Sequence, residues 1–117
     1  MNINAHVVNM YRPVILGEEI KKLFLQPNYI RKAWKEYVDI LKQYGYRCPT
    51  ENTFRLEIFM AIKLGLLDIA YKRKPAKGNF PITYYQVVPE KINDKAWSSI
   101  VGYYKKMLKQ KKKQIKR

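Results

Sequence analysis

The sequence predicts a small α+β domain that is mainly α. Apolar residues recur at helical spacing in four segments, one pair of strand-like segments follows the third of them, and turn residues separate that pair. The chain has 117 residues, which is enough for one hydrophobic core. Its hydrophobic content of 47% is typical of a folded protein rather than a disordered one. We therefore expect one domain with appended terminal segments.

The chain is expected to begin with an N-terminal arm, residues 1–12, in which apolar and polar residues alternate. Pro13 is tolerated in the first turn of a helix, and the spacing of the following apolar residues predicts a first helix over 14–25. Pro27 ends this helix.

A second helix is predicted over 29–44, with Asn28 as its cap and Gly45 as its stop. Its apolar stripe consists of Ile30, Ala33, Trp34, Tyr37, Val38 and Leu41. The opposite face is largely basic and carries Arg31, Lys32, Lys35 and Lys42. Such a face is either ordinary solvated surface or a contact to phosphates as the helix crosses a nucleic-acid backbone.

A third helix is predicted over 50–64. Thr50 is a suitable N-cap, Glu51 in the first turn suits the positive end of the helix dipole, and Gly65 provides a stop. Spacings of three and four residues place one apolar set on a common face: Phe54, Ile58, Ala61 and Ile62. Further apolar residues predict that the helix is covered on more than one side: Leu56, Phe59 and Met60.

Two strands follow, over 67–72 and 82–88. Apolar residues alternate with other residues in the first segment, and β-branched and aromatic residues dominate the second. Prolines, a glycine and an asparagine interrupt the pattern between them, so a hairpin with a long loop is expected. The loop region carries four basic residues and no acidic one: Lys72, Arg73, Lys74 and Lys77.

A last helix is predicted over 95–112, capped by Asn93 or Asp94. One apolar stripe runs along it and must be buried, either on its own chain or on a second copy: Trp97, Ile100, Val101, Tyr104 and Leu108. The chain closes with a basic tail, 109–117, in which six of nine residues are Lys or Arg. This run is either frayed or an anchor on nucleic acid through Lys111, Lys112 and Lys113.

The third helix ends in Lys-x-Gly-Leu-Leu and leads straight into a hairpin with a basic tip. This arrangement resembles the recognition helix and wing of winged helix-turn-helix proteins, among them small regulators of archaea and their plasmids and viruses. The resemblance implies a winged helix-turn-helix over 13–90, with a β-hairpin wing (72–81) and an added C-terminal helix (91–108). Regulators of the PadR type place such a helix in a dimer interface, so a homodimer through the apolar stripe is implied as well.

The formal charge is +15, from 24 basic and 9 acidic residues, and it will attract polyanions. Nucleic acid is the first candidate partner and an anionic membrane surface the second. The resemblance implies duplex DNA, read in the major groove by early residues of the recognition helix: Thr50, Asn52, Thr53 and Arg55. For Arg55 the alternative is an ordinary surface ion pair with Glu51, one turn earlier.

The sequence offers little for catalysis, so we expect a protein that is not an enzyme and uses no metal or other cofactor. It has one His and one Cys, scattered acidic residues and no phosphate-binding glycine loop. A metal-free ribonuclease built from Lys, Arg and Tyr is left open. Cys48 has no partner for an internal disulfide, and no signal peptide or membrane span is evident, which favours the cytoplasm.

Two other functions fit the same pattern. One is an RNA-binding or ribosome-associated protein, in which exposed tyrosines stack on unpaired bases. The other is a protein-interaction module that recruits an acidic partner. An RNA-binding protein should prefer RNA over duplex DNA at equal salt. A protein-interaction module should keep its function when the charges of the wing are reversed.

Overall fold

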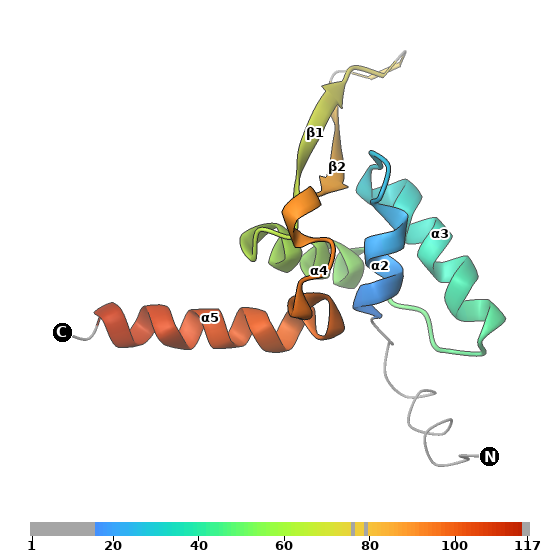
Figure 1. Ribbon diagram of the computed structural model, residues 1–117. Helices are drawn as coiled ribbons and strands as arrows, with labels where there is room; N and C mark the ends of the chain where they lie inside the picture. Colours follow the sequence, from blue (N-terminus) through green and yellow to red (C-terminus); the bar gives the residue numbers. More distant parts are fainter. Residues whose placement is uncertain (1–15, 76, 79, 116–117) are drawn as a thin grey trace.

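The computed structural model describes residues 16–75, 77–78 and 80–115 (Figure 1). Its elements in chain order are α2 (Gly17–Leu23), α3 (Ile30–Gln43), α4 (Glu51–Lys63), β1 (Leu67–Arg73), β2 (Ile82–Val87), the 3₁₀ turns η1 (Pro89–Lys91) and η2 (Lys95–Ser98), and α5 (Ile100–Ile115). The predicted α+β class, mainly helical with one hairpin, is confirmed. The predicted arm, 1–12, lies outside the described residues.

One core joins the three helices to the segment that follows the hairpin. Helix α3 packs against both α2 and α4, and η2 packs against α2. The largest fully buried side chains come from every one of these segments: Trp97, Tyr37, Phe24, Phe54, Ile20 and Leu41. The rings of Tyr37 and Phe54 lie 5.2 Å apart, and the Tyr37 hydroxyl accepts a hydrogen bond from the backbone N–H of Leu16. The core therefore fixes α3 and α4 relative to each other.

The first helix is shorter than predicted, and a glycine fixes its position. Helix α2 begins at Gly17 and ends at Leu23, whereas residues 14 and 15 are not described. A Cβ atom on Gly17 would lie 1.9 Å from the carbonyl oxygen of Trp97. Only glycine therefore allows the backbones of α2 and η2 to approach this closely.

The segment between α2 and α3 pairs with the hairpin, which corrects the prediction for Asn28. Strands β1 and β2 are antiparallel, with Leu67 opposite Val87 and a bulge between Ile69 and Tyr71. Asn28 forms an isolated bridge with Tyr85 through two backbone hydrogen bonds of 3.0 and 2.8 Å. The N-cap of α3 is thus Tyr29, and the buried Asn28 side chain donates instead to the Leu23 carbonyl and to the Glu36 carboxylate.

Helix α4 forms as predicted at both ends, but part of the side on which further cover was predicted is exposed. The Thr50 hydroxyl accepts a hydrogen bond of 3.2 Å from the Thr53 N–H, and Gly65 adopts a φ of 80° just beyond the helix. The prediction of cover on a second side holds for Met60, which packs against the core, and is wrong for Leu56 and Phe59, which are 58% and 43% exposed. The neighbours of α4, namely α3, β1 and α5, leave these two side chains open.

The predicted helix over 95–112 is wrong at its start. The Asp94 carboxylate accepts a hydrogen bond from the Ala96 N–H and caps η2, Ser99 is not helical, and α5 begins only at Ile100. The reason is the burial of Trp97, whose indole N–H donates to the Lys91 carbonyl at 2.8 Å. Helix α5 then continues to Ile115, so the boundary drawn after Leu108 does not mark a helix end.

Candidate nucleic-acid interface

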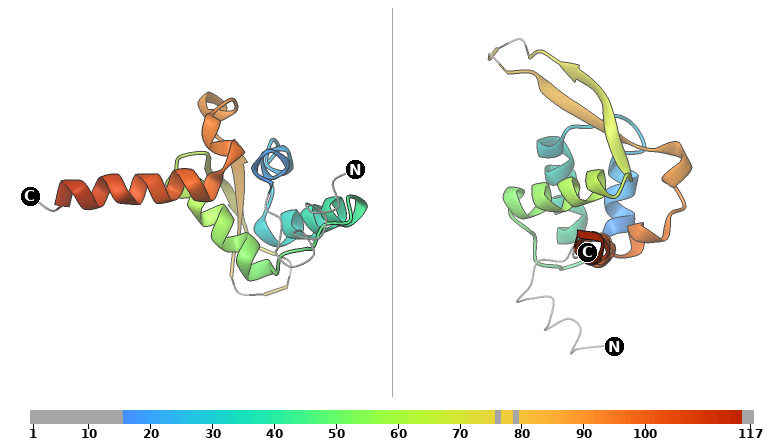
Figure 2. Two further views of the ribbon diagram at one scale, coloured as in Figure 1. Left: turned by 90° about the horizontal axis from the view of Figure 1, so that it is seen from below. Right: turned by 90° about the vertical axis from the view of Figure 1, so that its left-hand side faces the viewer.

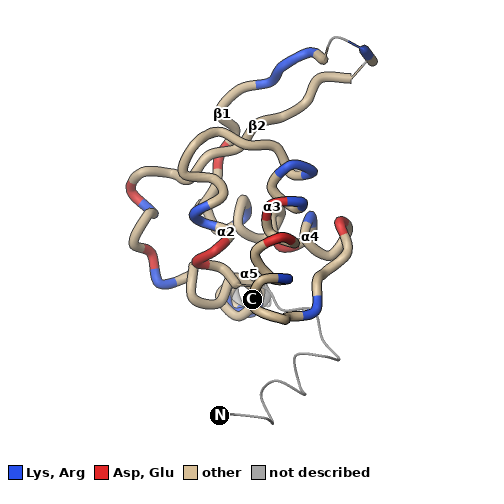
Figure 3. The backbone as a smooth tube through the Cα atoms, turned by 90° about the vertical axis from the view of Figure 1, so that its right-hand side faces the viewer, with Lys and Arg blue, Asp and Glu red and all other residues tan. Residues whose placement is uncertain are grey.

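The end of the hairpin carries basic side chains without acidic neighbours. Four side chains of the predicted wing are exposed: Lys72, Arg73, Lys74 and Lys77. No ion pair among the described residues involves any of these four. The one acidic residue of the hairpin strands, Asp68, lies near the start of β1, where its carboxylate accepts a hydrogen bond from the Ile69 N–H (Figure 3). The hairpin is therefore a positively charged projection (Figure 3).

A series of three tyrosine rings connects the hairpin to the start of α3. Tyr71 of β1 stacks on Tyr84 of β2 with ring centroids 4.6 Å apart. Tyr84 in turn meets the edge of Tyr29, the N-cap of α3, at 5.3 Å. Aromatic pairs of these geometries add about 0.5–1.5 kcal/mol each beyond buried area. Together with the Asn28–Tyr85 bridge, the rings hold the middle of the hairpin in a fixed position beside α3.

The predicted base-reading residues of α4 have different environments. Asn52 and Thr53 are exposed at the start of the helix. The Thr50 hydroxyl is engaged as the helix cap and also lies 3.1 Å from the Thr53 hydroxyl. Asn52 is therefore the member of the set whose side chain is exposed and outside the capping interaction.

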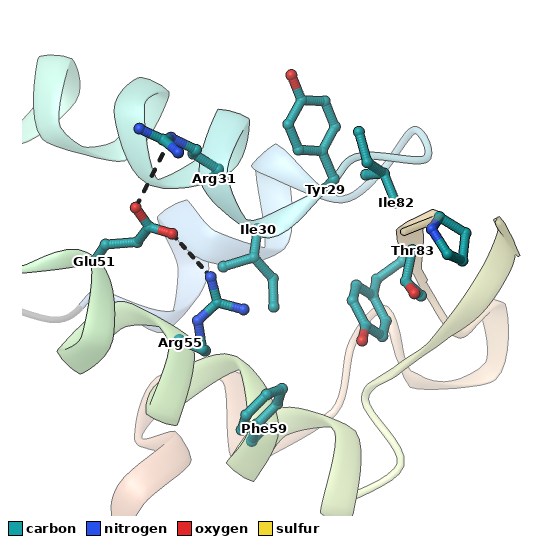
Figure 4. A pocket seen from close by; sticks show the side chains of 10 residues that line it. Tyr29, Ile30, Arg31, Glu51, Arg55, Phe59, Ile82 and Thr83 are labelled. Carbon is teal, nitrogen blue, oxygen red and sulfur yellow. Dashed lines mark hydrogen bonds and ion pairs between the residues drawn. The ribbon is translucent and has the colours of Figure 1, made fainter. Parts of the chain in front are cut away.

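Arg55 forms an ion pair with Glu51. This pair is the alternative to base reading that the sequence left open for Arg55. Its guanidinium donates to the Glu51 carboxylate at 2.8 Å, and the other carboxylate oxygen lies 4.0 Å from Nε of Arg31 on α3. Glu51 thus lies between two arginines from two helices (Figure 4). The pair is half-buried, with the Arg55 side chain 41% and the Glu51 side chain 28% exposed, so the Arg55 guanidinium remains accessible to an incoming anion.

These residues border a cleft of about 390 Å³ that the sequence analysis did not predict (Figure 4). The start of α3, one side of α4 and the beginning of β2 form its walls. The lining residues are Tyr29, Ile30, Arg31, Glu51, Arg55, Phe59, Pro81, Ile82, Thr83 and Tyr85. Helical spacing had assigned Phe59 to a buried stripe, and no local signal placed Tyr29 beside Tyr85.

The structure divides the predicted dimer residues into two groups. Trp97 and Ile100 are buried inside the chain, which corrects their assignment to a contact with a second copy. Val101 and Tyr104 are half-buried, and Leu108 is exposed. These three residues lie on α5, which leaves the helical body in a direction different from that of the hairpin (Figures 1 and 2).

The basic residues predicted as an anchor belong to the last part of α5. Lys111 is exposed, and Lys112 and Lys113 continue the helix, although their side chains lie outside the described part of the structure. Because α5 and the hairpin diverge, these lysines and the basic residues of the hairpin do not form one patch (Figure 2).

The chain matches no family model, and no curated protein matches it as a relative. Within the described residues, no group of three His, Cys, Asp or Glu side chains could hold a metal ion. In the same residues, no helix combines the length and apolar character that crossing a membrane requires. Function must therefore be inferred from the geometry of the hairpin, α4 and the cleft.

Proposed function

We propose that this protein binds duplex DNA as a winged helix-turn-helix protein and that it is a binding protein rather than an enzyme. In this proposal α4 enters the major groove with its first turn, and the wing lies against the sugar-phosphate backbone. A role as a transcriptional regulator, or as a site-binding factor of a plasmid or virus, fits such binding.

The observation that carries the proposal is the wing itself. Four basic side chains stand there without an acidic partner among the described residues, on a hairpin held beside the helices. Neutralising phosphates with such groups releases counterions and makes affinity depend steeply on salt. The exposed Asn52 at the start of α4 supports base contacts, because an Asn amide can pair with adenine through two hydrogen bonds.

A fluorescence-anisotropy titration against a short DNA duplex, at several salt concentrations, tests the proposal. The variant Lys72→Gln, Arg73→Gln, Lys74→Gln and Lys77→Gln should lower the slope of log affinity against log salt by up to about four. The control removes the same charge elsewhere, at Lys22, Lys91, Lys95 and Lys105, and should leave most of the slope. Absence of duplex binding at low salt, or equal slopes for the two variants, would overturn the proposal.

RNA binding is the second candidate, and the exposed aromatic surface of the hairpin favours it. Tyr71 is 46% exposed, and Phe80 at the hairpin end is more exposed still. Aromatic rings in such positions stack on unpaired bases in many RNA-binding proteins. Structured RNA belongs in the same titration at equal salt, and clearly tighter RNA binding would replace DNA as the proposed partner.

We also propose that the protein is a homodimer formed through α5. Val101, Tyr104 and Leu108 lie on one stripe of this helix, and its outer half extends beyond the body (Figure 1). Sedimentation equilibrium should give twice the chain mass for the native protein and the single-chain mass for Leu108→Asp. A monomeric native protein would refute this part of the proposal without affecting DNA binding.

A further inference from the structure

The cleft beside α4 has the size and lining of a site for one nucleotide. Its volume of about 390 Å³ falls within the roughly 300–1,000 Å³ of small-ligand pockets. The lining includes three aromatic residues from three different elements, Tyr29, Phe59 and Tyr85, and two arginines, Arg31 and Arg55. In Figure 4 the Phe59 ring and the Arg55 guanidinium group lie on the α4 side of the cleft, whereas the Tyr29 ring points away from them. Aromatic faces and guanidinium groups together are the usual surroundings of a nucleobase and its phosphate.

The aromatic part of the lining favours an unpaired base over a paired one. A base within a duplex is covered on both faces by its neighbours, so its faces cannot reach a side chain. A base that has left the stack exposes a face on which an aromatic ring can stack, whatever its sequence. Phe59 is open to such contact, since 43% of it is exposed at the cleft although its chemistry favours burial.

The charged part of the lining favours a phosphate at the edge of the cleft. Arg31 and Arg55 together outweigh Glu51 by one positive charge. Among the described residues Arg31 has one ion-pair contact, of 4.0 Å to Glu51, and its side chain is 68% exposed, so it can turn toward a new anion at little cost. The positive end of the α3 dipole lies at the same place, where Tyr29 gives no side-chain cap.

We propose that this cleft holds one unpaired nucleotide of the bound DNA, with its base against Phe59 and its phosphate on Arg31 and Arg55. The inference rests on the proposed DNA binding and specifies the form of DNA, namely a duplex with a displaced base. The cleft lies between α4 and β2, so a nucleotide in it adjoins both elements proposed to contact the duplex.

Two DNA duplexes that differ by one central unpaired thymidine test the inference in an anisotropy titration. The native protein should bind the bulged duplex about tenfold more tightly, within the range that stacking of one base contributes. Phe59→Leu keeps an apolar side chain but removes the ring, and it should abolish most of this preference. Phe59→Tyr keeps the ring and should retain it. Ile92→Ala alters a comparably exposed apolar residue outside the cleft and serves as the control.

The possible outcomes separate this inference from the proposed function. Equal binding of both duplexes by the native protein overturns the inference and leaves DNA binding intact. Equal loss of preference in Phe59→Leu and Phe59→Tyr also overturns it, because the ring is then not what the base contacts. Failure to bind either duplex removes the proposed function. In that case a short oligothymidine strand tests whether the cleft binds a nucleotide. The strand must bind the native protein more tightly than it binds the Phe59→Leu variant.

Discussion

Replacing Glu57 by Gln should make the protein more stable at neutral and alkaline pH. Glu57 lies on the packed side of α4 and is only 5% exposed. Burial raises the pKa of its carboxyl from 4.5 to about 7, because the charged form loses its hydration. Burial also raises the pKa of the neighbouring Tyr37, and the charge of Glu57 contributes to that increase. The folded state therefore favours a neutral side chain at position 57.

The sign of the pH effect follows from these two values. Between pH 4.5 and about 7 the unfolded chain has lost the Glu57 proton while the folded chain still holds it. The folded state binds more protons in this window, so the free energy of unfolding falls as pH rises through it. At 1.36 kcal/mol per pH unit, the full loss above about pH 7 is about 3 kcal/mol. Gln carries no charge and avoids this loss.

The assay is urea unfolding followed by tryptophan fluorescence at a series of pH values. The stability difference between Glu57→Gln and the native protein should be small near pH 5 and grow to about 3 kcal/mol near pH 8. Glu90→Gln changes an exposed carboxyl and should follow the native protein at every pH. A difference for Glu57→Gln that stays constant with pH would refute the reasoning, because it would mean that Glu57 is already charged throughout.

Three further changes test the packing of the fold, each by its effect on the urea midpoint. Gly17→Ala places a Cβ atom against the Trp97 carbonyl and should cost about 1–3 kcal/mol, and an unchanged midpoint would show that the two backbones move apart freely. Thr50→Ala removes the cap of α4 and should cost about 1 kcal/mol, and rescue by Thr50→Ser would confirm the cap. Asn28→Ala leaves the Leu23 carbonyl without its side-chain donor and should cost about 1–3 kcal/mol, and an unchanged midpoint would show that water replaces the amide.

The elements that the sequence predicted well are those whose signals are local. Thr50 and Gly65 mark the ends of α4 through contacts within a few residues, and the turn residues between β1 and β2 mark the hairpin in the same way. The Arg55–Glu51 pair was also foreseeable, because residues four apart on a helix are neighbours.

The errors arose where a distant partner decides the structure. Asn28 has the chemistry of a cap, but pairing with Tyr85 on β2 takes its backbone into the sheet. Trp97 has helical spacing to the residues of α5, but its burial holds it in a 3₁₀ turn. The exposure of Phe59 depends on where β1 and α5 cover α4, which periodicity along one helix cannot indicate. The cleft was unpredictable for the same reason, since three separate elements create it.

The attachment of the hairpin at one end only has a consequence for how its length can vary. The Asn28–Tyr85 bridge and the three tyrosine rings fix the hairpin from its base to the Tyr71–Tyr84 pair, whereas the loop beyond Arg73 has no such supports among the described residues. Insertions near the base would shift the register of Tyr84 and Tyr85 and break both supports. Insertions at the end would cost only the small entropy of a longer loop. The reach of the hairpin can therefore change in evolution without disturbing the body that holds it.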